Sequence, residues 1–69
     1  MNNPWNLTDR QAEVLDALIE HGNEKQAARH LGVHSNTVCY SIKEAKAKMG
    51  VPHRIQAVIE WDRWKRVGS

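Results

Sequence analysis

Polar and basic side chains recur between residues 36 and 47 at the spacing of one helical face. At about 100° per residue, a helix through this segment would present these outward groups: Asn36, Tyr40, Lys43 and Ala47, flanked by Thr37 and Cys39. Ammonium groups bind phosphate oxygens through charge-assisted hydrogen bonds, and amide, hydroxyl and phenol groups form hydrogen bonds with polar atoms of a partner. These residue types favour recognition of a polyanion over bond-making chemistry.

The same segment contains an apolar stripe that would hold this helix in place. Four apolar residues fall on one narrow face, at steps of four, three and four: Val38, Ile42, Ala45 and Met49. The helix is expected to span about residues 35–49 and to end at Gly50. Its start lies within "HSNT", where we favour Ser35 as the cap because its hydroxyl side chain is short.

A first helix is predicted near the start of the chain. Thr8 and Gln11 have the spacing of a capping box, so the helix should begin there and end at Gly22. Its inward face should consist of apolar residues at helical spacing: Val14, Leu15, Leu18 and Ile19.

Between these two elements the sequence predicts a short helix over residues 24–31, capped by Asn23 and ended by Gly32. Ala28 is small enough to let the next helix approach closely, and Val33 can fill the space between the two helices. A short helix, a tight glycine turn and a longer helix with exposed polar groups are the proportions of a helix-turn-helix.

A last helix is expected over about residues 53–66, after Pro52. The sequence contains no alternating strand pattern, internal repeat or low-complexity segment. Because 69 residues can bury only one small core, residues 1–69 are predicted to form a single all-α domain of four helices.

Charge is unevenly distributed along the chain. Residues 1–24 contain five acidic side chains and one arginine, whereas residues 25–54 contain six basic side chains and one glutamate. The basic middle suits a polyanion such as a nucleic acid, and the acidic first third is expected to face away from it.

Several other classes of protein are disfavoured by the composition. Cys39 is the one cysteine, so no internal disulfide can form. No apolar run approaches the roughly 20 residues needed to cross a bilayer, and the first residues lack the pattern of a signal peptide. A cytoplasmic protein is therefore expected. We also expect that it is not an enzyme, because the sequence contains no group of residues typical of a catalytic site. His30, His34 and Cys39 are ligand types for zinc, but they straddle a turn and lack a fourth partner. We expect no metal, cofactor, small-molecule ligand or membrane partner.

Four sequence blocks resemble, in order and spacing, the LuxR-type (GerE-like) DNA-binding domain: "LTDRQAEVL", "AARHLGV", "NTV" and "KMGVPHRIQAV". The resemblance covers about residues 7–60. It implies a bundle of four helices, with the third in the major groove of double-stranded DNA and the fourth commonly used for dimerisation. The expected function is a DNA-binding transcription regulator.

Individual residues match the family pattern to different degrees. Thr37 and Val38 match the start of the recognition helix, whereas Cys39 replaces a common lysine and Ser41 a histidine; Arg54 matches a mainly structural arginine. Because thiols form weak hydrogen bonds, base readout at position 39 should be altered. The full set expected to contact DNA is Lys25, Asn36, Thr37, Val38, Cys39, Tyr40, Lys43, Lys46 and Ala47.

The last predicted helix offers a dimerisation surface. Its expected contacts are Ile55, Ile59, Trp61 and Trp64, because aromatic residues are enriched at the centres of interfaces. An alternative for the tryptophans is a cluster in which Trp5 packs on this helix and seals the bundle.

Other functions remain open on the sequence alone. The lysines could be an ordinary solvated face, and the helix-turn-helix could serve as a protein-binding adaptor or as a DNA-packaging or recombination accessory. As a regulator, the chain is expected to act as a stand-alone domain of phage or mobile-element type.

Overall fold

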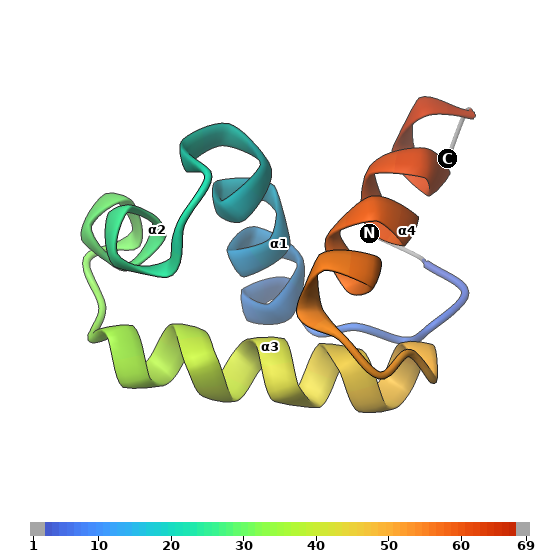
Figure 1. Cartoon of the computed structure of the whole chain (residues 1–69), viewed down its shortest axis with the longest axis horizontal. Helices are drawn as coiled ribbons and strands as arrows, with labels where there is room; N and C mark the ends of the chain where they lie inside the picture. Colours follow the sequence, from blue (N-terminus) through green and yellow to red (C-terminus); the bar gives the residue numbers. More distant parts are fainter. Residues whose placement is uncertain (1–2, 68–69) are drawn as a thin grey trace.

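One long helix, α3 (Ser35–Met49), lies along one side of the molecule, and the other three helices pack against it (Figure 1). The computed structural model describes residues 3–67, which contain no strand and form four helices: α1 (Asp9–His21), α2 (Glu24–Leu31), α3 (Ser35–Met49) and α4 (Arg54–Arg66). α1 and α3 each contact the other three helices, whereas α2 and α4 lie on opposite sides of α1. The predicted all-α bundle of four helices is confirmed.

The start of α1 is the predicted capping box. The Thr8 hydroxyl accepts a hydrogen bond from the Gln11 backbone N–H at 3.2 Å, and Gln11 Oε1 accepts one from the Thr8 N–H at 3.0 Å. At the other end, Gly22 has a φ of 83°, a left-handed conformation that glycine adopts without strain. Asn23 then caps α2 by accepting from the Gln26 N–H at 2.8 Å.

The start of α3 differs from the sequence prediction. His34 is the capping residue, its side chain makes no capping hydrogen bond, and Ser35 is already the first residue of the helix. The preference for Ser35 as the cap was therefore wrong. The position is set by the tight turn after α2, in which the Val33 N–H bonds to the Ala28 carbonyl at 3.0 Å.

The core consists of two clusters that share the α1–α3 contact. One surrounds the fully buried Leu15 and the other the fully buried Val14, which are neighbours on α1. The first cluster contains Leu7, Leu15, Ala45, Ala57 and Trp61, and the second contains Val14, Ala28, Val38 and Ile42. The apolar stripe predicted for α3 thus faces inward.

One predicted core position is wrong. Ile19 is 41% exposed, and Ala17 is buried instead. Leu18 is half-buried and packs against both clusters, so the buried face of α1 is centred closer to Val14 and Leu18 than the four-residue pattern indicated.

The last helix is held to α1 by a buried indole. The Trp61 N–H donates to Asp16 Oδ1 at 2.8 Å, and the same oxygen accepts from Lys65 Nζ at 2.6 Å. Trp5 packs against Trp61 and Trp64, with ring centroids 6.2 and 5.9 Å apart. The predicted tryptophan seal on the last helix is confirmed.

Two substitutions on α1 should separate core from surface. Leu15→Ala removes a fully buried side chain and should destabilise the protein by about 2–5 kcal/mol. Ile19→Ala removes a similar volume from a partly exposed site and should cost less than about 1 kcal/mol. Urea unfolding followed by circular dichroism measures both values. Equal losses from the two variants would contradict this assignment of the core.

Candidate nucleic-acid interface

A rigid turn fixes the direction of α3 relative to α2. Gly32 has a φ of 72°, and its N–H bonds back to the carbonyls of Ala28 and Arg29. Ala28 is 4% exposed, so its small side chain lies directly in the contact between the helices. Val33 packs on the same cluster, as the sequence predicts for a helix-turn-helix.

The two faces of α3 differ sharply in exposure. The inner face is buried, whereas Tyr40 on the outer face keeps 64% of its surface exposed. The exposed residues of the predicted contact set on this helix are Asn36, Thr37, Cys39, Tyr40, Lys43 and Ala47. Lys46 is half-buried, and Lys25 is exposed on α2. The structure therefore brings most of the set to one accessible side of α3, while contact with DNA stays a prediction.

Val38 is the exception in this set. Its side chain is fully buried in the cluster around Val14. A side chain with no exposed surface cannot touch DNA, so the prediction that Val38 is a contact residue is wrong. The residue instead anchors the start of α3. Ser41 is also buried, at 5% exposure, and faces inward.

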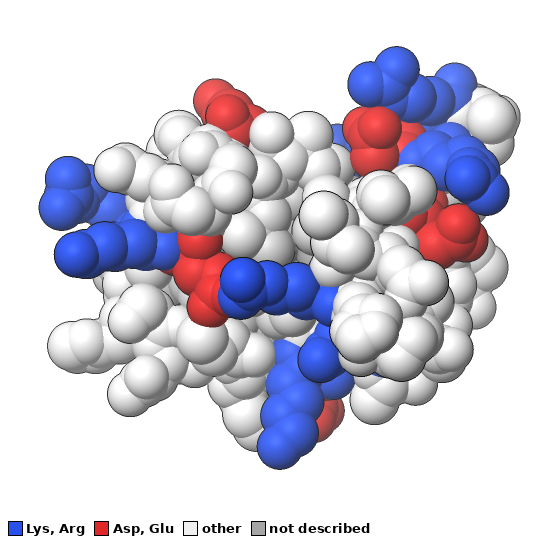
Figure 2. Space-filling view, in the orientation of Figure 1, with Lys and Arg blue, Asp and Glu red and all other residues white. Residues whose placement is uncertain are grey.

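On the face seen in Figure 2, basic and acidic side chains are mixed rather than separated. In that view, blue groups over the α2 end, below the middle and around α4 have red groups close to several of them. Lys48, at the end of α3, donates to the Asn6 carbonyl and to Gln11 Oε1, both at 3.0 Å. Lys48 thus ties the end of α3 to the segment before α1 and to the first turn of α1.

Glu24 is the residue of this region that the sequence did not indicate. Its carboxylate accepts a hydrogen bond from the Cys39 thiol and forms an ion pair with Arg54. These contacts join the start of α2 to α3 and to the start of α4. The expectation that the acidic first third faces away from the basic helix is therefore wrong for Glu24, because this side chain packs beside α3.

Glu24 also lines a shallow hollow between the three helices. The other residues of its wall are Cys39, Ile42, Lys43, Lys46 and Arg54. The hollow thus combines three basic side chains with one carboxylate and one thiol. Three residues of this wall, Cys39, Lys43 and Lys46, belong to the set that the sequence predicted for DNA contact. The hollow is therefore continuous with the exposed side of α3.

A second exposed surface lies on α4. Ile55 and Ile59 are 65% and 49% exposed, and Trp64 is half-buried. Ile55 and Val58 line a groove next to Leu18 and Gly22. Trp61, by contrast, is fully buried within its own chain, so the prediction that it contacts a second copy is wrong. Its indole is needed for the core and for the bond to Asp16.

Within residues 3–67, none of the helices combines the length and the apolar character needed to cross a lipid bilayer.

The chain is similar to known regulatory proteins. Residues 5–61 match the family described as bacterial regulatory proteins, luxR family. The spore germination protein GerE of Bacillus subtilis is 39% identical over 54 residues, which cover 78% of this chain and 73% of GerE. The transcriptional regulatory protein DesR of the same organism is 38% identical over 52 residues, which cover 75% of this chain and 26% of DesR.

The matched region contains all of α1, α2 and α3 and most of α4, so the similarity and the helix-turn-helix geometry describe the same part of the chain. The chain belongs to the luxR family of bacterial regulatory proteins.

Proposed function

We propose that this protein is a DNA-binding transcription regulator that places α3 in the major groove of double-stranded DNA. The observation that carries the proposal is the long exposed side of α3, held from behind by the buried contacts of Val38, Ile42 and Ala45. The major groove of B-DNA admits one α-helix, and base edges there differ for every base pair. Family membership and the printed name of DesR, a transcriptional regulatory protein, support this choice.

In this proposal, the side chains around α3 divide into two roles. Lys25 and Lys46 neutralise phosphates, which fixes the register of the protein without reading sequence. Tyr40 and Lys43 lie in the middle of the exposed side of α3 and reach base edges. Tyr40 is well suited to contact a thymine methyl group because most of its ring is exposed.

The remaining exposed residues complete the surface. Asn36 and Thr37 lie in the first turn of α3, where side chains of a recognition helix contact bases or backbone. Ala47 adds a small side chain near the other end of the helix, which lets the duplex approach closely. The Cys39 thiol already donates a hydrogen bond to Glu24. This position therefore contributes to the shape of the DNA-facing surface more than to hydrogen bonding with a base.

We also propose a homodimer through α4. Ile55 and Ile59 are large apolar side chains exposed one turn apart on the same helix, and Trp64 extends this surface. A single subunit binds few phosphates, whereas two subunits on half-sites about one turn of DNA apart bind jointly. Because the DNA of a bacterial cell lies in the cytoplasm, the dimer would act there.

Salt dependence tests the proposal directly. If about four phosphates are neutralised per subunit, the logarithm of the association constant should fall with log salt at a slope near −3.6 per subunit. Lys25→Ala should reduce this slope by about 0.9, because Lys25 is one of the two lysines proposed to neutralise phosphates. Arg63→Ala, a matched change of an exposed basic residue on α4, should leave it unchanged.

Fluorescence anisotropy with labelled genomic fragments at several salt concentrations gives these slopes. Absence of binding to any fragment at low salt would refute the DNA-binding proposal and favour the protein-binding adaptor. An equal change of slope from Lys25→Ala and Arg63→Ala would contradict the phosphate contact proposed for Lys25.

Sequence readout should depend on Tyr40 and not on Lys46. Tyr40→Ala should change the preferred DNA sequence, because it removes a contact to base edges. Lys46→Ala should weaken binding to all sequences to a similar extent, because phosphate contacts do not read sequence. Selection from a random DNA library compares the two variants with the parent, and Tyr40→Phe separates the ring from the hydroxyl. Identical preferences in the parent and in Tyr40→Ala would show that Tyr40 does not read bases.

Dimer formation should depend on the exposed isoleucines. Replacing Ile55 and Ile59 together by serine should weaken self-association at least about tenfold, because burial of each side chain contributes roughly 1.5–3 kcal/mol. Ile19→Ser changes an exposed isoleucine on α1 and serves as the matched control. Sedimentation equilibrium measures the association constants. A double variant that associates like the parent would remove α4 from the dimer interface.

A further inference from the structure

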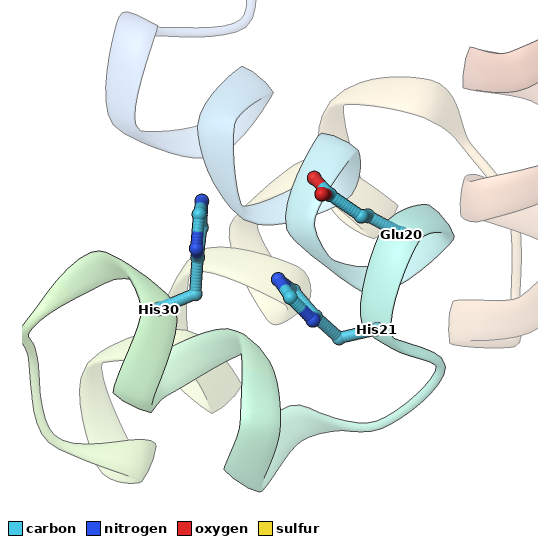
Figure 3. Close-up of side chains that lie close together, drawn as sticks. All are labelled: Glu20, His21 and His30. Atoms are coloured by element: carbon cyan, nitrogen blue, oxygen red, sulfur yellow. The ribbon is translucent and has the colours of Figure 1, made fainter.

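Three potential metal ligands meet where α1 ends and α2 packs back against it. Glu20 and His21 are the last two residues of α1, and His30 lies in the last turn of α2. The left-handed turn at Gly22 reverses the chain, so that residues nine positions apart become neighbours. Figure 3 shows the three side chains from these two helices converging, with the outer end of the His21 ring directed between Glu20 and His30.

The spacing of these groups is close to that of a metal site. One ligand atom from each residue lies within 4.8 Å of the other two, and the two imidazole centroids are 4.7 Å apart. A tetrahedral ion with bonds of about 2.0–2.1 Å keeps its ligand atoms roughly 3.3 Å from one another. Glu20 and His30 are exposed, so rotation of their side chains can close the difference.

An unpaired nitrogen points independently to a ligand. His21 Nε2 is buried and has no hydrogen-bond partner among the described residues. A buried polar atom without a partner destabilises the fold, and such atoms in native proteins often mark a missing ion or water. Each imidazole can bind a metal cation through a ring nitrogen in its neutral form.

We propose that Glu20, His21 and His30 bind a Zn²⁺ ion or a chemically similar transition-metal ion. Two imidazole nitrogens and one carboxylate oxygen suit these ions, whereas Ca²⁺ and Mg²⁺ prefer ligand sets made of oxygen alone. Three protein ligands leave one coordination position for water. The bound ion would fasten the end of α1 to α2, the helix that precedes the turn into α3.

This site is separate from the surface proposed to bind DNA. None of its three residues belongs to the exposed side of α3 or to the hollow around Glu24. The site also differs from the zinc ligand set considered in the sequence analysis, His30, His34 and Cys39. The two sets share only His30. Metal binding can therefore be measured without DNA.

Calorimetric titration of ZnCl₂ tests the proposal. All proteins contain Cys39→Ser, so that the exposed thiol does not bind zinc. The parent should bind one Zn²⁺ per chain and should show no comparable heat with MgCl₂. His30→Gln and Glu20→Gln should each weaken zinc binding at least about tenfold, the loss caused even by removing groups that support metal ligands. The matched control His34→Gln, another exposed histidine at a helix end, should bind zinc like the parent.

Thermal unfolding gives a second readout. A free zinc concentration about 100 times the dissociation constant should raise the melting temperature of the parent by roughly 10 °C or more. The shift should be lost in His30→Gln, whose circular dichroism spectrum without zinc should match that of the parent because the side chain is exposed. Unchanged zinc affinity in both His30→Gln and Glu20→Gln, or an equal loss in His34→Gln, would overturn the proposal.

Discussion

The packing of α3 on α1 is the contact on which the other features depend. Val14 and Leu15 on α1 are fully buried, and they meet Val38, Ile42 and Ala45 on α3 in two adjoining clusters. With its inner face held this way, α3 cannot rotate without exposing apolar surface. The same contact therefore determines which side chains face outward. Because Ile42 is buried against α1, Tyr40 on the opposite face of α3 is exposed.

Features set by neighbouring residues were predictable from the sequence, whereas features set by distant contacts were not. The capping box of Thr8 and Gln11 and the end of α1 at Gly22 depend on a few adjacent residues, and both were predicted correctly. The cap of α3 was not, because the turn after α2 decides where the helix starts and leaves His34 in that position. For Trp61 the sequence left both a dimer contact and a tryptophan seal open. The contacts with Trp5 and Asp16, 56 and 45 positions earlier in the sequence, decide for the seal.

The candidate surfaces divide in the same way. Helical periodicity alone placed Tyr40 and Lys43 on the exposed side of α3. It could not indicate Glu24, whose partners Cys39 and Arg54 lie 15 and 30 positions further along the chain. The group of Glu20, His21 and His30 also needs the geometry of the turn between two helices. The zinc ligand types that the sequence offers close together are His30, His34 and Cys39, a set that the sequence analysis disfavoured because it straddles the next turn.

Glu24 has a consequence for how such a protein would move along a genome. A carboxylate beside a cationic helix repels every duplex equally, whatever its base sequence. On the proposed DNA-binding function, it would therefore shorten the residence time on unrelated DNA, while contacts to the correct bases would be lost only where those bases are absent. Weaker non-specific binding leaves more protein molecules free to sample new sites on the DNA. In this way the half-buried partner of Arg54 would also speed the search for a target.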